Sequence, residues 1–199
     1  MPKKRSRRDS NLRRHLAYVA ARLIAEEGMD YATAKSKAAR QEGLSEANLL
    51  PDNQEIEEAL REYQELYQKD EQPLVLRRLR EVAVKVMREL DDFRPALVGS
   101  VLSGTAGAHS DVNLQLFTDD SKTLAMFLVN KRYRFEEGSR RVQRGGRMEE
   151  VPQFAIEVED AIVTLTVLDR DDERTRIRAE PGEPPLRARL AEVEALLRP

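Results

Sequence analysis

The sequence contains no cysteine, no tryptophan and only two histidines, His15 and His109. Without cysteine the chain cannot form a disulfide, a thiolate nucleophile or a cysteine-ligated zinc site, and two histidines are too few for a histidine-rich metal centre. Long apolar runs are also missing, because the stretch from Leu16 to Ala21 is interrupted by Arg22. This excludes a signal peptide there and a membrane-spanning helix anywhere, so we expect a cytoplasmic protein.

Charge, by contrast, is abundant and unevenly distributed. Charged residues make up 35% of the 199 residues, which predicts long solvated helix faces in one compact domain or two small ones. The net charge is −2, yet the first 14 residues carry seven basic residues against Asp9 alone: Lys3, Lys4, Arg5, Arg7, Arg8, Arg13 and Arg14. Such a basic arm is typical of a polyanion-binding segment or of a solubilising tail. The stretch PKKRSRR at 2–8 also fits a nuclear address or the start of a transit peptide.

Apolar residues recur at helical spacing over the first half of the chain. In the third expected helix, for example, the apolar residues are Ile56, Leu60, Tyr63 and Tyr67. Polar N-caps, glycine stops and a proline in a first turn predict four helices in all. They run from Asp9 or Ser10 to Gly28, from about Asp30 to Glu42, from an Asn53 cap to about Tyr67, and from Pro73 to about Phe93.

From Pro95 onward the apolar pattern changes to that of strands. The expected strands are 96–99, 112–117, a segment around Tyr133 and Phe135, 153–158 and 161–168, with a helix starting at Asp119-Asp120. In 161–168 valine and leucine alternate with Thr164 and Thr166, which predicts one apolar and one hydroxyl-bearing face. A charged linker at 169–185 and an amphipathic helix then close the chain, the helix containing Leu186, Leu190, Val193 and Leu197.

Residues 99–114, between the first two expected strands, read GSVLSGTAGAHSDVNL. This stretch resembles the signature of the nucleotidyltransferase superfamily typified by polymerase beta: a Gly-Ser pair, a spacer, then an acidic-hydrophobic-acidic triplet on the next strand. Gly99 and Ser100 match the pair, Gly104 matches a further glycine, and Ser110-Asp111 match the residues before and at the first carboxylate. In less detail, the resemblance extends over roughly residues 76–170.

The resemblance implies a site for a nucleotide and for magnesium. In the superfamily, backbone amides around the Gly-Ser turn bind a triphosphate, and carboxylates on neighbouring strands hold the metal. By this correspondence the nucleotide-binding residues are Gly99, Ser100, Gly104 and Ser110, and the metal ligands are Asp111 and Asn113. In an active enzyme Asp111 is the expected catalytic carboxylate.

The chain departs from the superfamily pattern at two positions. Asn113 holds a neutral amide where the second carboxylate of the triplet is expected, and the third carboxylate aligns with Thr164. A different register would bring Glu157, Glu159 or Asp169 there, because a two-residue slip keeps a side chain on the same face. An amide oxygen coordinates magnesium without adding negative charge, so the sequence predicts weak magnesium binding.

A second basic segment lies at 131–148. Its basic residues are Lys131, Arg132, Arg134, Arg140, Arg141, Arg144 and Arg147, against Glu136 and Glu137, with a Gly-Gly turn inside RGGR at 144–147. If it forms a hairpin on the side of the Gly-Ser loop, its arginines would contact phosphates of a nucleotide or RNA. The alternative is an exposed hairpin with the charges that edge strands usually carry.

Two further features are less informative. Residues 19–45 superficially resemble the start of a tetracycline-repressor-type regulator, but Leu49-Leu50-Pro51 would end a recognition helix starting at Ser45 after about one turn. A plain helical hairpin is the alternative. His109 is a conceivable general base beside Asp111, although a solvated loop residue is the simpler interpretation.

These features predict an α+β fold: a helical N-terminal region followed by a nucleotidyltransferase-like mixed β-sheet with flanking helices. The expected division is a flexible basic arm at 1–14, a helical region at 15–72, the α/β core at 73–170, and a linker with a C-terminal helix at 171–199. The expected function is binding of nucleic acid, RNA rather than DNA, or of a nucleoside triphosphate by a non-catalytic superfamily member. The alternatives are an active magnesium-dependent nucleotidyltransferase that modifies RNA or protein, and an accessory subunit whose N-terminal helices bind a protein partner.

Overall fold

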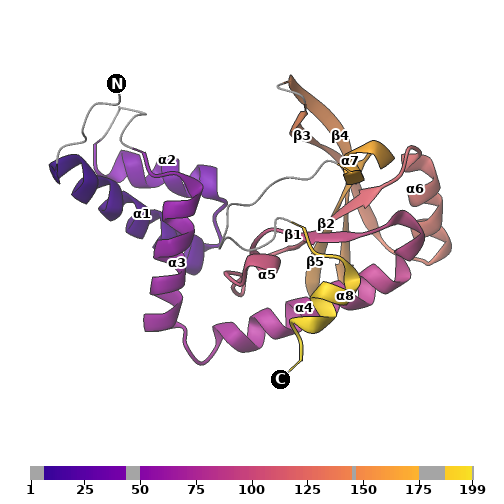
Figure 1. Ribbon diagram of the computed structural model, residues 1–199, viewed down its shortest axis with the longest axis horizontal. Helices are drawn as coiled ribbons and strands as arrows, with labels where there is room; N and C mark the ends of the chain where they lie inside the picture. Colours follow the sequence, from indigo (N-terminus) through magenta and orange to yellow (C-terminus); the bar gives the residue numbers. More distant parts are fainter. Residues whose placement is uncertain (1–6, 44–49, 145–146, 175–186, 199) are drawn as a thin grey trace. The chain divides into compact units, whose positions relative to one another are not determined.

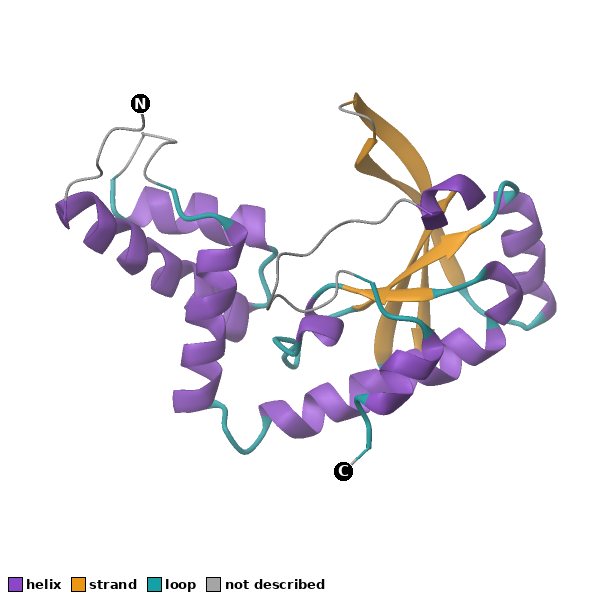
Figure 2. Cartoon of the chain, in the orientation of Figure 1, coloured by secondary structure: helices purple, strands orange, loops and turns teal. Residues whose placement is uncertain are grey.

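The computed structural model describes residues 7–43, 50–144, 147–174 and 187–198 (Figures 1 and 2). The chain divides into two compact units. The helical unit comprises Met1–Leu74 with Gly107–His109, and the sheet unit comprises Val75–Ala106 with Ser110–Pro199.

Three helices make up most of the helical unit: α1 Arg7–Glu27, α2 Tyr31–Gln41 and α3 Asn53–Tyr67. The buried faces of α1 and α2 are rich in alanine, whose short side chain lets neighbouring helices approach closely. The shared core consists of Leu16, Ala17, Val19, Ala20, Leu23, Ala34, Ala38 and Ile56. The plain helical hairpin is therefore present, whereas residues 44–49, where the repressor-like interpretation would place the start of a recognition helix, lie outside the described residues.

The start of α1 corrects the predicted arm. The helix begins at Arg7 and not at Asp9 or Ser10, so residues 7–14 are helical and do not form a flexible arm. Asp9 lies in the first turn, where a negative charge complements the helix dipole. Residues 1–6 lie outside the described part of the chain.

The cap of α3 also differs from the prediction, because Asp52 and not Asn53 is the N-cap. The Asp52 carboxylate accepts a hydrogen bond from the Glu55 backbone N–H at 2.9 Å, and the Glu55 carboxylate accepts one from the Asp52 N–H at 2.8 Å. This reciprocal pair satisfies two backbone donors that a helix start leaves without intrahelical partners.

At the other end of α3, Tyr67 is 64% exposed, so its predicted place among the buried apolar residues of this helix is wrong.

The sheet unit contains both helices and strands from α4 onward (Figure 1). In chain order the elements are α4 Gln72–Glu89, the 3-10 turn Asp91–Phe93, β1 Ala96–Val98, α5 Ser100–Ser103, β2 Val112–Phe117, α6 Ser121–Asn130, β3 Phe135–Arg144, β4 Arg147–Val158, β5 Ala161–Leu168, α7 Arg170–Arg174 and α8 Leu190–Ala195. The helix α7 occupies the start of the segment 169–185, which was predicted to be a linker. The rest of that segment and Leu186 lie outside the described residues.

The five strands form one mixed sheet in the order β1-β2-β5-β4-β3. β2 and β5 run parallel, and the other neighbouring pairs are antiparallel. The α+β class and the order of a helical region followed by a mixed sheet are therefore confirmed. None of the described helices is both long and apolar enough to cross a membrane.

Alternation along the strands gives the sheet two different faces. Val112, Leu114 and Leu116 of β2 lie in a core shared with α4 and α6, whereas Asn113 and Gln115 lie on the opposite face. We call this opposite side the open face. Strand pairing also places Thr164 and Thr166 of β5 and Gln153 of β4 on it, so the predicted apolar and hydroxyl-bearing sides of 161–168 are confirmed.

One end of the open face carries a small apolar cluster, formed by Ala96, Phe117, Val151 and Leu168 with Val142 packed against it. The C-terminal segment reaches this cluster because Ala188 pairs with Leu97 of β1 through two backbone hydrogen bonds of 2.8 and 2.9 Å. As a result the guanidinium groups of Arg187 and Arg189 each lie 5.1 Å from the centre of the Phe117 ring. The cluster is thus bordered by positive charge.

Candidate functional site

The Gly-Ser turn lies between the end of β1 and the start of α5. Gly99 adopts φ 75° and ψ −157°, a combination that is essentially restricted to glycine. A Cβ placed on Gly99 would lie 3.6 Å from Asn113 Nδ2, which is an ordinary contact. Backbone conformation, and not crowding, is therefore the reason for glycine at this position.

The loop after the turn is closed by hydrogen bonds to a single carbonyl. Ser100 O accepts from the backbone N–H groups of Gly104, Thr105 and Ala106 at 2.9, 3.0 and 3.1 Å. Gly104 supports this closure with φ +92°, a left-handed conformation that favours glycine. The loop therefore has a fixed shape without help from a ligand.

The side chain of Arg80 of α4 donates hydrogen bonds to two carbonyl oxygens of α5, just before this loop. Its Nε donates to Val101 O at 3.1 Å, and its Nη2 donates to Leu102 O at 3.5 Å. Burial lowers the pKa of Arg80, because a guanidinium loses hydration there. Arg80 was not predicted as part of the site, because its place one turn after Leu76, beside the buried residues of α4, is only a weak signal.

Asp111 and Asn113 lie at the start of β2, as the sequence predicts. Asn113 Nδ2 donates a hydrogen bond to the backbone oxygen of Asp111 at 3.2 Å, so part of its amide is used within the strand. Burial raises the pKa of Asp111, although the residue as a whole remains exposed. The partial burial makes Asp111 a poorer anion than a fully solvated carboxylate.

Strand pairing places Thr164 directly opposite Asn113 in the parallel β2–β5 pair. An amide and a hydroxyl therefore lie side by side on the open face, at the two positions where the superfamily pattern has carboxylates. Both side chains are neutral, so neither adds charge to a metal site.

The other candidates for a third carboxylate are held elsewhere in the sheet unit. Glu157 on β4 pairs with Ile162, so the width of β5 separates it from β2. Glu159 lies in the β4–β5 turn and forms an ion pair with Lys85 at 2.6 Å, which lowers the pKa of Glu159. Asp169 follows Leu168, which pairs with Phe117 at the C-terminal end of β2. Asp111 precedes the N-terminal end of that strand, so the whole length of β2 lies between them. Within the described residues, no group of three or more acidic or histidine side chains could hold a metal ion.

From Phe135 onward the second basic segment lies in the paired strands β3 and β4, as both of its interpretations predict. β3 and β4 pair from Phe135↔Ile156 to Arg144↔Arg147, so alternation places Arg140 and Arg147 on the open-face side and Arg141 on the other. Arg141 also forms an ion pair with Glu150 at 3.4 Å.

The remaining predicted nucleic-acid contacts fall where little is described. Arg144 lies at the end of β3, and Arg7 and Arg8 lie in α1, in each case with only the backbone described. Lys3, Lys4 and Arg5 lie outside the described residues. The paired guanidinium groups of Arg187 and Arg189 beside Phe117 were not predicted, since nothing in the sequence shows that the C-terminal segment returns to β1.

His109 belongs to the helical unit and not to the sheet unit that holds Asp111. Its side chain lies against Gly28 at the end of α1, so close that a Cβ on Gly28 would be 2.6 Å from the Cβ of His109. Gly28 also has φ +67°, so both its conformation and this contact require glycine. His109 is exposed and serves in packing, which agrees with its interpretation as a loop residue.

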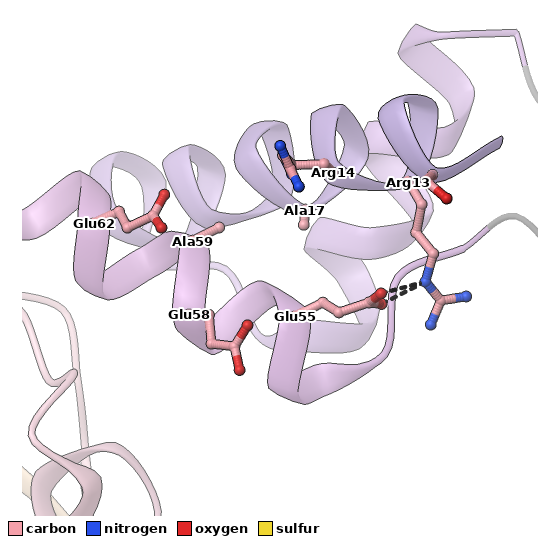
Figure 3. A pocket seen from close by; sticks show the side chains of 8 residues that line it. Arg13, Arg14, Ala17, Glu55, Glu58, Ala59 and Glu62 are labelled. Carbon is pink, nitrogen blue, oxygen red and sulfur yellow. Dashed lines mark hydrogen bonds and ion pairs between the residues drawn. The ribbon is translucent and has the colours of Figure 1, made fainter. Parts of the chain in front are cut away.

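The helical unit has a groove of its own between α1 and α3 (Figure 3). It is a cavity of about 300 Å³ lined by Ser10, Arg13, Arg14, Ala17, Glu55, Glu58, Ala59 and Glu62. The short side chains of Ala17 and Ala59 leave the space, and the ion pair between Arg13 Nε and Glu55, at 2.5 Å, bridges the two helices. In the alternative of an accessory subunit, this groove is the place on the N-terminal helices where a protein partner would bind.

Comparisons with family models, with curated protein sequences and with solved structures found no match for this chain.

Proposed function

We propose that this chain is a non-catalytic protein with a nucleotidyltransferase-like fold that binds the phosphate groups of nucleic acid, RNA in preference to DNA, or of a nucleotide. The observation that carries the proposal is the juxtaposition of Asn113 and Thr164 on neighbouring parallel strands. The glycine turn between β1 and α5 and the pairing of β2 with β5 as neighbouring strands support the likeness to the superfamily. The neutral side chains of Asn113 and Thr164, however, do not support the superfamily's metal-dependent reaction.

Nucleotidyl transfer needs magnesium ions that hold the triphosphate and activate the attacking hydroxyl. Mg²⁺ is a hard cation that favours anionic oxygen ligands. Asp111 is the one carboxylate of the superfamily pattern that this chain retains, and its pKa is raised by burial. We therefore expect magnesium and a nucleoside triphosphate to bind together only weakly, in the millimolar range.

Phosphate binding, in contrast, needs cations and backbone donors, and the open face has a basic end. Arg140 and Arg147 lie on the open-face side of the hairpin, and Arg187 and Arg189 border the Phe117 cluster. Guanidinium groups suit phosphate because they offer several donors in a fixed geometry. Arg189 is in part neutralised by Glu173 at 2.7 Å, so we expect the hairpin arginines to make most of the phosphate contacts.

The test is a pair of binding measurements on the full chain. We expect fluorescence anisotropy at low salt to show binding of single-stranded RNA, and calorimetry with ATP and magnesium to show no micromolar affinity. A micromolar, magnesium-dependent affinity for the triphosphate would support the active enzyme instead. Absence of binding to RNA, to DNA and to nucleotides at low salt would favour the accessory subunit.

A further inference from the structure

The outer edge of β3 is a second interface candidate, and it shares Arg140 with the phosphate-binding surface proposed for the open face. β3 is the last strand of the sheet, and its inner edge pairs with β4 along its whole length. Among the described residues no strand pairs with its outer edge, and residues 136–141 are exposed (Figure 1). An open strand edge presents backbone donors and acceptors that another strand can pair.

Edge strands usually carry charges that repel a second strand. In β3, however, the sign of the charge changes along the strand. Glu136 and Glu137 precede Gly138-Ser139, and Arg140 and Arg141 follow it. An antiparallel second copy of the same strand therefore brings acidic residues next to basic ones.

We propose that two copies of this chain pair through β3 in antiparallel orientation, with Gly138 on the two-fold axis. A two-fold axis perpendicular to the sheet places the same face of both copies on the same side of the joined sheet. Each residue of β3 must therefore oppose a residue of the second copy whose side chain lies on that same face. With Gly138 opposite its own copy, Glu136 opposes Arg140 of the second copy, and the same pair forms again across the axis. Opposite charges at directly opposed positions stabilise an antiparallel pair.

Neighbouring registers are less favourable. Centring the pair on Arg140 or on Glu137 places like charges opposite each other. Centring it on Ser139 matches Glu137 with Arg141, whose guanidinium already pairs with Glu150 at 3.4 Å in its own hairpin. Glu136 and Arg140 have no ion pair among the described residues, so both are available.

The axis position carries no side chain, because it is a glycine. A Cβ built on Gly138 meets no heavy atom within 4 Å in its own chain, so a side chain introduced there has room on its face of the sheet. The two strands overlap over residues 135–141, and a strand pair of this length buries less surface than the interface of an obligate dimer. We therefore expect a monomer–dimer equilibrium that depends on protein concentration.

The register can be tested directly because the chain has no cysteine of its own. Opposed residues in an antiparallel pair have Cα atoms about 4.5–5.5 Å apart, within the range that a disulfide spans. Under mild oxidation Gly138→Cys should form a disulfide-linked dimer efficiently. Ser139→Cys is the matched control, because in this register its copy lies at a diagonal distance of about 7–8 Å.

The charge pattern is tested by sedimentation velocity over a wide range of protein concentration. Glu136→Arg and Arg140→Glu should each weaken dimerisation at least about tenfold, since each change puts like charges at two symmetric positions. The double variant with both changes should restore the dimer. Glu65→Arg, an equal charge change on the exposed face of α3, should leave the equilibrium unchanged.

Two results would overturn the proposal. One is a wild-type chain that remains monomeric at several hundred micromolar and at low salt, with equal crosslinking at positions 138 and 139. The other is a double variant that dimerises as poorly as the two single variants. Because Glu136→Arg adds positive charge, its loss of the dimer without weaker RNA binding would separate this interface from the proposed function.

Discussion

The two faces of the central sheet differ in chemistry, although the same strands build both. On the face shared with α4 and α6, Leu114 and Leu165 are 1% and 0% exposed. On the open face, their chain neighbours Asn113 and Thr164 are half-buried and polar. The comparison indicates that the apolar face determines the fold, whereas the side chains of the polar face can vary without loss of the fold.

The largest expected difference between the faces is in stability. Leu165→Ala should lower the free energy of unfolding by about 2–5 kcal/mol, because it removes buried methyl groups and leaves a cavity. Thr164→Val, one residue away on the open face, should change it by less than about 1 kcal/mol. Urea denaturation followed by circular dichroism measures both. Equal losses in the two variants would contradict the assignment of the faces.

The next largest effect concerns the Gly-Ser turn between β1 and α5. Gly99→Ala should destabilise the chain by about 1–3 kcal/mol, because φ 75° with ψ −157° is accessible almost only to glycine. Gly138→Ala is the matched control, since Gly138 is not in a positive-φ conformation and a Cβ there meets nothing. Denaturant midpoints of the two variants should therefore differ clearly. A neutral Gly99→Ala would show that the turn adopts another conformation.

A smaller, functional effect is expected from restoring the carboxylates. Asn113→Asp combined with Thr164→Asp should strengthen magnesium binding at least about tenfold, because charged ligands raise affinity for hard cations. Calorimetry with magnesium measures this gain, and adding Asp111→Asn to the double variant should remove much of it. An unchanged affinity in the double variant would show that these three positions do not form one site.

The smallest effect is the pH dependence contributed by Asp111. Burial raises the pKa of Asp111, so the folded chain binds this proton more tightly than the unfolded chain. The stabilising contribution is therefore present below the ordinary carboxyl pKa of 3.8 and is lost as pH rises through the folded pKa. Asp111→Asn should gain stability relative to the wild type between acidic and neutral pH, as urea midpoints at the two pH values can show. A gap that stays constant or reverses would contradict the burial of this carboxyl group.

Much of the fold could be predicted from the sequence because periodicity reports burial. The alternation in 161–168 and the buried positions Ile56, Leu60 and Tyr63 of α3 both appear in the structure at the predicted residues. Local details were less predictable: Asp52 and Asn53 are both good caps, and only the reciprocal bond to Glu55 selects the first. Tyr67 continues the helical spacing of α3, yet nothing packs over it sufficiently to bury it.

The candidate site was predictable in its residues but not in its geometry. The sequence located the Gly-Ser turn and suggested Thr164, but only strand pairing places Thr164 opposite Asn113. Likewise the sequence shows a cluster of hairpin arginines, while their assignment to faces depends on the exact strand register. Contacts made by distant segments, such as Arg187 and Arg189 with Phe117, left no local signal at all.

The most direct test of the account is the salt dependence of RNA binding in two arginine variants. With single-stranded RNA, each lost phosphate contact should reduce the log–log slope by about 0.7. Arg140→Ser with Arg147→Ser should reduce the slope accordingly, whereas Arg141→Ser, on the other face and paired with Glu150, should leave it nearly unchanged. The measurement uses the anisotropy of a fluorescently labelled chain at nanomolar concentration, titrated with RNA, because the chain is then monomeric throughout. An equal reduction in both variants, or no RNA binding by the wild type at low salt, would contradict phosphate binding on the open face.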